Sequence, residues 1–572
     1  MVLNSRSHLR KWCRQVLCAG FVLSCLAGAI AAGLASEKDA RKEINKAHLL
    51  ETIKTLASDD FEGRAPASRG EERTIKYLEE QFKQMGLAPG NPDGTFVQKV
   101  PMLGVTADPS MRLVFEPAGG SGKMELTFSR DFMAWTRRDV PEASINAPLV
   151  FVGYGIVAPE YQWDDYKGVD VAGKVLVMLV NDPPIPDPKT PGALDDNMFR
   201  GKAMTYYGRW TYKFEIAAAK KAAGCLIIHE TGPAGYPWEV VGNNTGERFA
   251  LVTPDGGMSR AAVEGWITYP KAKALFEMTG RDLDVLKRTA LDHSFRPVEL
   301  GATASLTIRN TIRRIDSSNF VAKLEGRDEK LHDEYVILNA HWDHLGIGPE
   351  VNGDKIYNGA RDNATGVAGI MEIARAFAKS RPRRSILFLA TTAEEQGLLG
   401  AQYYAENPLY PLTKTLADIN LDVMNTRGRT RDITVVGLGM SSLDDEIIQA
   451  AREQGRVVIS DPEPEKGYYY RSDHFEFAKQ GVPALDPKEG VEEVGKPQGA
   501  GLEARRRYTA EDYHKPSDEV KPDWDLSGMV EDLELIYTVA NRVANSKSFP
   551  VWKPGTEFKA KREEMLSNAA RN

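Results

Sequence analysis

Three apolar segments in the second half of the chain constrain its fold more than any other feature. They are EYVILNA (334–340), SILFLA (385–390) and LADINLD (416–422), and each is short and largely apolar. Strands of this kind are buried on both faces of a sheet. Segments of helical character such as GVAGIMEIARAFA (366–378) alternate with them. This alternation predicts an α/β fold in which helices flank a mixed, mostly parallel sheet.

Polar side chains with metal-binding chemistry follow these predicted strands. They occur in five segments: AHWDHLG with His341, Asp343 and His344; YNGARDNATG with Asp362 and Asn363; TTAEEQG with Glu394 and Glu395; INLD with Asp422; and YHKPSDE with His514. Loops at the carboxyl ends of the strands of an open α/β sheet converge on one crevice. We therefore expect the five segments to meet at one site.

The residue types in these segments favour a pair of divalent ions. Imidazole and carboxylate groups without cysteine suit zinc and harder divalent metals. Two ions about 3.5–4 Å apart need one carboxylate that bridges them. Glu394 and Glu395 are adjacent, so one of them can bind metal while its neighbour acts as general base.

Together these motifs resemble the di-zinc aminopeptidases of metallopeptidase family twenty-eight, relatives of glutamate carboxypeptidase II and glutaminyl cyclase. The resemblance implies a zinc-peptidase (phosphorylase/hydrolase-like) fold that holds two Zn²⁺ per chain. It implies five metal ligands: His341, Asp362, Glu395, Asp422 and His514. One ion would be held by His341 and Asp422, the other by Glu395 and His514, and Asp362, followed by a cis peptide bond, would be shared.

The resemblance also implies three catalytic residues. Glu394 is the expected general base, and Asp343 is the carboxylate that orients His341. A tyrosine three residues before the SDH motif (472–474) would stabilise the oxyanion, which places this role on Tyr469 in a run of three tyrosines.

The chain divides into five predicted parts. Residues 1–35 form a signal peptide, 36–144 the N-terminal part of the peptidase domain, and 145–300 an inserted unit. Residues 301–547 form the catalytic part, and 548–572, rich in Lys and Glu, a solvated C-terminal tail. The inserted unit contains GRWTYKFE and AAGCLIIHE, which resemble a protease-associated (PA) domain with a smaller α/β fold.

The N-terminus is typical of an exported protein. A basic stretch precedes an apolar run from Val16 to Ala32 and a small-residue cleavage site before Ser36. An uncleaved anchor helix is the alternative. Three of the four cysteines lie in this leader, and Cys25 is a candidate for lipid anchoring. We expect a periplasmic or secreted protein with no membrane span in the mature chain.

These features predict an aminopeptidase that removes N-terminal residues from peptides with a free N-terminus. A carboxypeptidase or dipeptidase of the glutamate carboxypeptidase II type is the alternative, with Arg361 or Arg471 binding a substrate carboxylate. A receptor-like binding protein is a further alternative, but it predicts missing ligands. The net charge of −7 argues against nucleic acid as a partner. Neither oligomeric state nor side-chain preference follows from the sequence.

Overall fold

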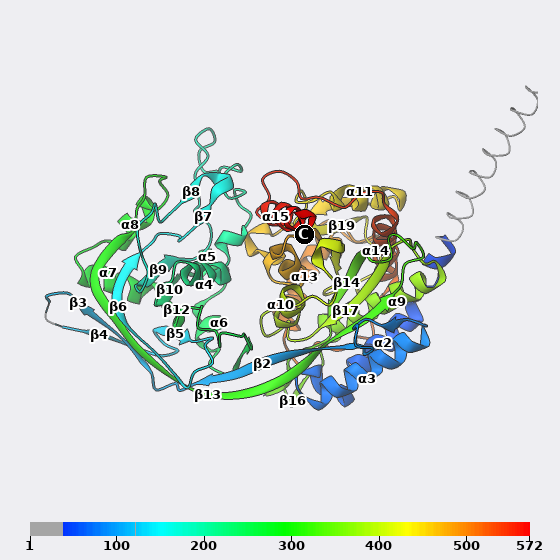
Figure 1. Ribbon diagram of the computed structural model, residues 1–572, viewed down its shortest axis with the longest axis horizontal. Helices are drawn as coiled ribbons and strands as arrows, with labels where there is room; N and C mark the ends of the chain where they lie inside the picture. Colours follow the sequence, from blue (N-terminus) through cyan, green and yellow to red (C-terminus); the bar gives the residue numbers. More distant parts are fainter. Residues whose placement is uncertain (1–37, 121, 572) are drawn as a thin grey trace, which may run out of the picture.

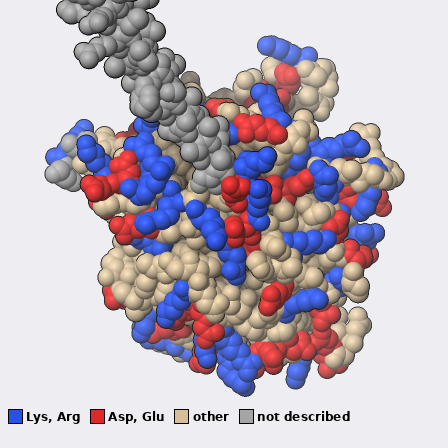
Figure 2. Space-filling view, turned by 90° about the vertical axis from the view of Figure 1, so that its right-hand side faces the viewer, with Lys and Arg blue, Asp and Glu red and all other residues tan. Residues whose placement is uncertain are grey.

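The computed structural model describes residues 38–120 and 122–571 (Figure 1). The predicted signal peptide, Cys25 included, lies outside the described residues. Within the described ranges, no helix has the length and apolar character needed to cross a membrane. Figure 2 shows one face of the molecule, on which Lys and Arg are interspersed with Asp and Glu. A mixed face of this kind favours solvation over binding of one highly charged partner.

The catalytic half is built on a mixed sheet whose central strands are the three predicted apolar segments. Strand by strand across the sheet, its members are β13 (Val298–Leu324), β17 (Ser385–Thr391), β14 (Tyr335–His341), β18 (Thr415–Asn420), β21 (Ala484–Lys488), β19 (Asp432–Val436) and β20 (Val457–Ser460). Strands β17, β14, β18 and β21 run parallel to one another. Every residue of β14, β17 and β18 is buried. The predicted fold class is confirmed.

Helices cover both faces of this sheet, because alternate side chains of each strand point to opposite faces. On one face, Val336 and Leu338 of β14 pack in a core with α2 (Lys46–Leu56), α3 (Arg69–Gln84), α9 (Thr365–Lys379) and α14 (Ser527–Asn545). On the other face, Tyr335 and Ile337 pack with α10 (Leu399–Glu406) and α12 (His474–Lys479). The site therefore stands on strands that are fixed from both sides.

A second apolar core lies within residues Met111–Ile308. Its sheet consists of β4 (Met124–Thr127), β3 (Arg112–Pro117), the first part of β13, β6 (Glu142–Phe151), β9 (Val175–Leu179), β10 (Gly224–His229), β12 (Val263–Thr268) and β5 (Phe132–Trp135). Strands β9 and β10 are parallel and are joined through helix α4 (Trp210–Ala219). We call this part the inserted unit; its boundaries at 145 and 300, and its likeness to a PA domain, stay predictions.

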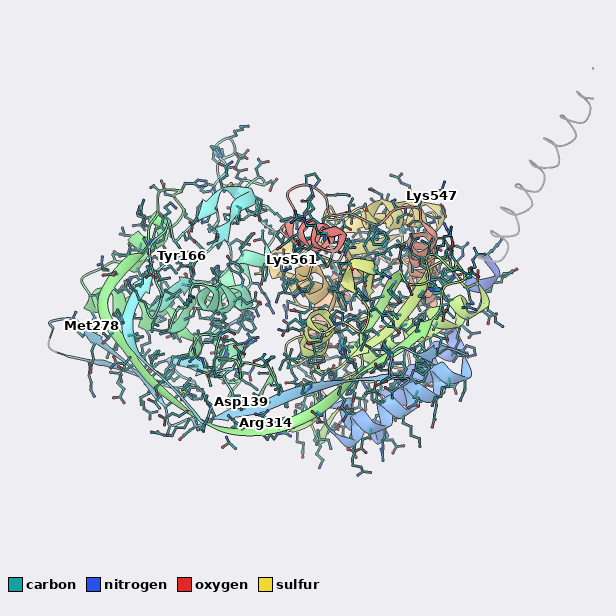
Figure 3. The ribbon with its side chains drawn as sticks, viewed as in Figure 1. Asp139, Tyr166, Met278, Arg314, Lys547 and Lys561 are labelled. Carbon is teal, nitrogen blue, oxygen red and sulfur yellow. The ribbon has the colours of Figure 1, made fainter. Side chains whose placement is uncertain are left out.

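A two-stranded arm connects the inserted unit to the catalytic half. Strand β13 takes part in both sheets, and between them Asn310–Phe320 pairs antiparallel with β2 (Val97–Ala107). Figure 1 shows this arm as the ribbon that runs along the bottom of the molecule. Arg314 forms an ion pair with Asp139 beside the arm (Figure 3).

The two parts also touch on the side opposite the arm. The Met204 amide donates to the Pro464 carbonyl over 3.1 Å, and Lys202 pairs with Glu465 at 3.3 Å. The ring of Tyr206 lies 5.3 Å from that of Phe475. The space between the inserted unit and the catalytic half is therefore bounded on two sides.

The end of the chain differs from the solvated tail predicted for residues 548–572. Trp552 and Phe558 are buried, and helix α15 (Lys559–Arg571) follows them. The buried Arg562 donates to the carbonyls of Leu412 and Thr415 at 2.9 and 2.8 Å, at the start of β18. Only two aromatic residues and one arginine anchor this segment, so its composition, which is dominated by Lys and Glu, does not reveal the anchoring.

Candidate metal centre

The predicted ligands lie together where the parallel strands end. His341 is the last residue of β14 and pairs in register with Thr391, the last residue of β17. Glu394 and Glu395 follow β17, and Asp422 lies two residues beyond the end of β18. Asp362 precedes α9, and the Asp362–Asn363 peptide bond is cis, as the resemblance implies.

Asp362 lies between the two predicted histidine ligands. Its Oδ1 is 3.3 Å from Nε2 of His341, and its Oδ2 is 3.4 Å from Nε2 of His514. His341 Nε2 is also 3.3 Å from Asp422 Oδ1, whereas His514 Nε2 is 2.9 Å from Glu395 Oε2. The five side chains thus fall into two groups that share one carboxylate, which is the pairing the resemblance implies.

The adjacent glutamates occupy different environments. Burial, together with the charges of Glu395 and Asp422, raises the pKa of Glu394 well above its usual range, although His341 acts in the opposite direction. Burial also opposes ionisation of Glu395, but His514 and His344 outweigh it and lower its pKa to about 2. Glu394 lies within 4.8 Å of His341 and Asp422, measured between possible ligand atoms. One glutamate is therefore held as an anion while the other favours a proton.

Asp343 supports both a histidine and the predicted base. Its carbonyl oxygen lies 3.2 Å from Nδ1 of His341, and its carboxylate lies 3.8 Å from the same atom. The carboxylate accepts a hydrogen bond of 3.1 Å from the Glu394 amide. Asp343 is thus placed to orient His341, chiefly through its main chain, and to fix the start of the Glu394 segment.

The structure adds positioning residues that the sequence reasoning gave no role. His344 Nδ1 lies 2.6 Å from Glu395 Oε1, and Asp518 Oδ2 accepts from the Asp362 amide at 3.0 Å. Ser472 donates to Asp422 Oδ2 at 2.7 Å, and Lys488 Nζ lies 3.3 Å from the same oxygen. His344, Asp518 and Ser472 lie in the HWDH, YHKPSD and SDH motifs, so their places in these motifs could have identified them as positioning residues. No sequence motif identifies Lys488.

Tyr469 is the one predicted site residue that the structure does not bring to the metal-ligand cluster. It packs in an apolar cluster with Met440 and Phe475, and its ring stacks with that of Phe558 at 6.1 Å. Its buried hydroxyl has no hydrogen-bond partner among the described residues. The neighbouring Tyr468 lines a cavity beside Asp422 instead. The oxyanion role predicted for Tyr469 therefore gains no support from its position.

Two cavities open at the cluster. The larger, of about 500 Å³, lies between the inserted unit and the catalytic half and is bordered by Glu394, Glu395 and His514. The smaller, of about 170 Å³, is bordered by Asp422, by other charged side chains and by Val and Tyr side chains. Arg471 and Tyr513 border both cavities. A ligand at the cluster can therefore extend in two directions.

The donor set fits divalent ions. Four carboxylates, those of Asp362, Glu394, Glu395 and Asp422, are gathered around the imidazoles of His341, His344 and His514. Lys488 is the one ammonium group that contacts them among the described residues. Carboxylates packed at such distances repel one another unless cations or protons neutralise them. Two divalent cations would balance four such charges. Imidazole and carboxylate donors without thiolate are ligands of zinc and of harder divalent metals.

The sheet and the residues at its strand ends define the class of protein: an α/β domain with a candidate metal centre at the carboxyl ends of its strands. Residues 319–538 match the family model of peptidase family M28. The chain therefore contains a peptidase domain of family M28.

Individual relatives are similar over parts of their length. A probable zinc metalloprotease of Pyrenophora tritici-repentis is 38% identical over 111 residues, which cover 19% of this chain and 25% of that protein. Leucine aminopeptidase 2 of Trichophyton equinum is 27% identical over 254 residues, 42% of this chain and 48% of that protein. The chain thus spans about a quarter to a half of the curated relatives that it matches.

A solved aminopeptidase from Aneurinibacillus sp. strain AM-1 is 19% identical, with a TM-score of 0.49. The match covers 91% of this chain and 98% of that chain.

Proposed function

We propose that this protein is an exported, zinc-dependent aminopeptidase that hydrolyses the N-terminal peptide bond of peptides. The carrying observation is the position of Asp362, whose two carboxylate oxygens face His341 and His514 separately. A carboxylate in this position suits two ions, whereas a single ion would leave one histidine without a role. The M28 domain and the zinc metalloprotease and leucine aminopeptidase among the relatives support the same proposal.

His341 and Asp422 would hold one ion, Glu395 and His514 the other, and Asp362 both. When bound, the ions would polarise the scissile carbonyl and lower the pKa of a water molecule. Ser472 and Lys488 keep Asp422 in place, and His344 does the same for Glu395. The chain thus holds its ligands in position through neighbours on other segments.

Glu394 would act as the proton carrier. It borders the larger cavity, and its main-chain amide is fixed by Asp343. A glutamate in this position can accept a proton from the attacking water and deliver it to the leaving amine nitrogen.

The alternative of a carboxypeptidase loses one of its two candidate residues. Arg361 is buried and forms an ion pair with Glu489, so it is not free to meet a substrate carboxylate. Arg471 has no such partner among the described residues.

Metal content and cleavage together test the proposal. Elemental analysis of the purified mature protein should give about two zinc per chain. The p-nitroanilide of an amino acid with a free amine should be cleaved, and the same anilide with a blocked amine should not. Two zinc without cleavage of the free-amine anilide would favour the carboxypeptidase or dipeptidase, and protein without metal or activity would favour a binding role.

A further inference from the structure

The larger cavity contains two arginines that have no counter-charge. Arg209, from the inserted unit, and Arg471, from the catalytic half, both border it, and neither forms an ion pair or a side-chain hydrogen bond within the described part of the chain. The Nε atom of Arg209 is buried and without a partner. Arg209 is partly buried, whereas Arg471 is exposed. A guanidinium group that is partly shielded from water normally finds a carboxylate or several acceptors. The guanidinium groups of Arg209 and Arg471 are therefore free to bind an anion that does not belong to the chain.

Other basic residues of the same cavity are already engaged. Arg137 pairs with Glu264 at 3.2 Å, and Lys479 pairs with Glu215 at 2.9 Å. Arg248 donates to the Asn244 carbonyl at 2.9 Å and lies over the ring of Trp135. Arg260 also borders this cavity and lacks an ion pair. The charges of Arg471 and Glu394, which border the cavity too, act on Arg209.

The environment of Arg209 favours an anion in two further ways. Burial, followed by the charge of Arg471, disfavours the charged form of Arg209 and lowers its pKa to about 10. Helix α4 starts at Trp210, directly after Arg209; no side chain caps it and its first turn contains no acidic residue. The positive end of this helix borders the cavity through Trp210 and Thr211, and the buried Thr211 hydroxyl also lacks a partner.

Glu394 indicates which part of a substrate would reach these arginines. Under the proposed function, Glu394 delivers its proton to the leaving amine, so the leaving fragment lies on the side to which Glu394 opens. Glu394 borders the larger cavity and not the smaller one. The fragment released after the N-terminal residue would therefore occupy the larger cavity, together with Arg209 and Arg471.

Resting on the proposed function, we propose that Arg209 and Arg471 bind the C-terminal carboxylate of the leaving fragment, which makes short peptides with a free C-terminus the preferred substrates. The cavity volume of about 500 Å³ suits a ligand of drug-like size, which corresponds to a few residues. The arm of β2 and β13 and the contact of residues 202–206 with 464–475 bound the space on two sides. The carboxylate of an acidic side chain could bind the same two arginines, so the test below includes a peptide that has this carboxylate and no free C-terminus.

The kinetic test compares peptides that differ only in the carboxylate. For each enzyme variant, kcat/KM is measured for an apolar dipeptide, for its C-terminal amide, and for an amidated dipeptide with Glu in second position. The wild-type enzyme should prefer the free acid to the amide by about ten- to hundred-fold, the range expected for hydrogen bonds to a charged group. Arg209→Gln and Arg471→Gln should each bring this ratio towards one, and because it is a ratio within one variant, general losses of activity cancel.

Arg260→Gln is the matched control, because it removes an unpaired positive charge from the same cavity. It should keep the wild-type ratio. A wild-type ratio near one, or a ratio that all three variants change equally, would overturn the proposal. A preference for the amidated Glu dipeptide over the free acid would also overturn it and assign the arginines to an acidic side chain.

A binding measurement separates this inference from the proposed function. Calorimetry with the Glu394→Gln variant compares the dipeptide acid and amide without turnover, and the acid should bind about ten-fold or more tightly. If no substrate is cleaved by the wild-type enzyme, the proposed function fails, and the binding comparison still decides on the arginines. Equal affinities for acid and amide would refute the carboxylate site.

Discussion

Both parts of this molecule bury charged groups, but they treat them differently. In the inserted unit, Lys213 donates to the carbonyls of Tyr154 and Asn181 at 2.7 and 3.2 Å. Asp182 accepts from the amide and the hydroxyl of Thr205, both at 2.7 Å. Both of these charges are met by groups of the chain itself.

At the ends of the catalytic strands, by contrast, possible ligand atoms face one another. His514 Nε2 lies near carboxylate oxygens of both Asp362 and Glu395, and the one proton that this nitrogen can carry cannot form a full hydrogen bond with each of them. Buried polar groups in folded proteins are normally hydrogen-bonded, so a cluster that is not satisfied internally indicates a ligand. The comparison separates charges that hold the fold from charges that are arranged for function.

Replacing Glu394 by Gln should have the largest effect. If the cluster is arranged for chemistry, removal of one proton carrier should lower kcat by about 10²- to 10⁴-fold, because general acid–base catalysis contributes that much. Metal content and the thermal midpoint should stay near those of the wild type. Glu406→Gln, which changes a glutamate that borders the same cavity, is the control. Full activity of the Glu394→Gln enzyme in the anilide assay would refute the role.

Removal of metal should destabilise the catalytic half. An ion present at a thousand times its dissociation constant stabilises the native state by about 4 kcal/mol. A chelator should therefore lower the thermal midpoint of the wild-type protein, and added zinc should restore it. Asp362→Asn, which removes the shared carboxylate, should make the midpoint insensitive to chelator. A wild-type midpoint that chelation does not move would place these carboxylates among structural charges.

In the inserted unit, Lys213→Met should affect stability and not chemistry. It leaves Asp182 without a nearby positive charge and the buried Asp165 with that of Lys167, and removal of one member of a buried charged group typically costs about 3–5 kcal/mol. Denaturant unfolding should show the loss, while kcat per folded molecule stays unchanged. Lys221→Met, at an exposed neighbouring position, should shift the unfolding free energy by less than about 0.5 kcal/mol. A collapse of kcat in folded Lys213→Met would contradict the comparison.

Much of the catalytic half could be predicted because its signals are local. The continuous apolar segments identify β14, β17 and β18, and parallel strands bring the residues after their ends to one edge. That rule brings together the segments that contain His341, Glu395 and Asp422, and the family resemblance implies that these residues are the ligands. The partners behind them do not: Lys488 reaches Asp422 from β21, and nothing in the sequence around Lys488 sets it apart from a surface lysine.

Long-range geometry accounts for the rest. Arg209 and Arg471 border one cavity because the arm of β2 and β13 carries the inserted unit alongside the catalytic half, and no local pattern encodes that placement. The run Tyr468–Tyr470 shows a second limit. It forms a 3-10 turn, in which successive side chains point about 120° apart. Only one of three adjacent tyrosines can face a given site, and spacing within the motif does not say which.

Tyr469→Phe should have the smallest effect. It tests whether an unpartnered polar group away from both cavities belongs to the fold or to the site. The Tyr469 hydroxyl lacks a partner among the described residues, but its ring lies among apolar side chains and 4.5 Å from the ring of His474, and it borders neither cavity. If an unpartnered polar group indicates a function only when it borders a cavity, the kcat of Tyr469→Phe should stay within about three-fold of the wild-type value. The unfolding free energy should rise by about 1 kcal/mol, because an unsatisfied buried hydroxyl is removed. Tyr468→Phe provides the comparison from the cavity wall. A hundred-fold loss of kcat in Tyr469→Phe would restore the oxyanion role and show that the side chain turns towards the site during the reaction.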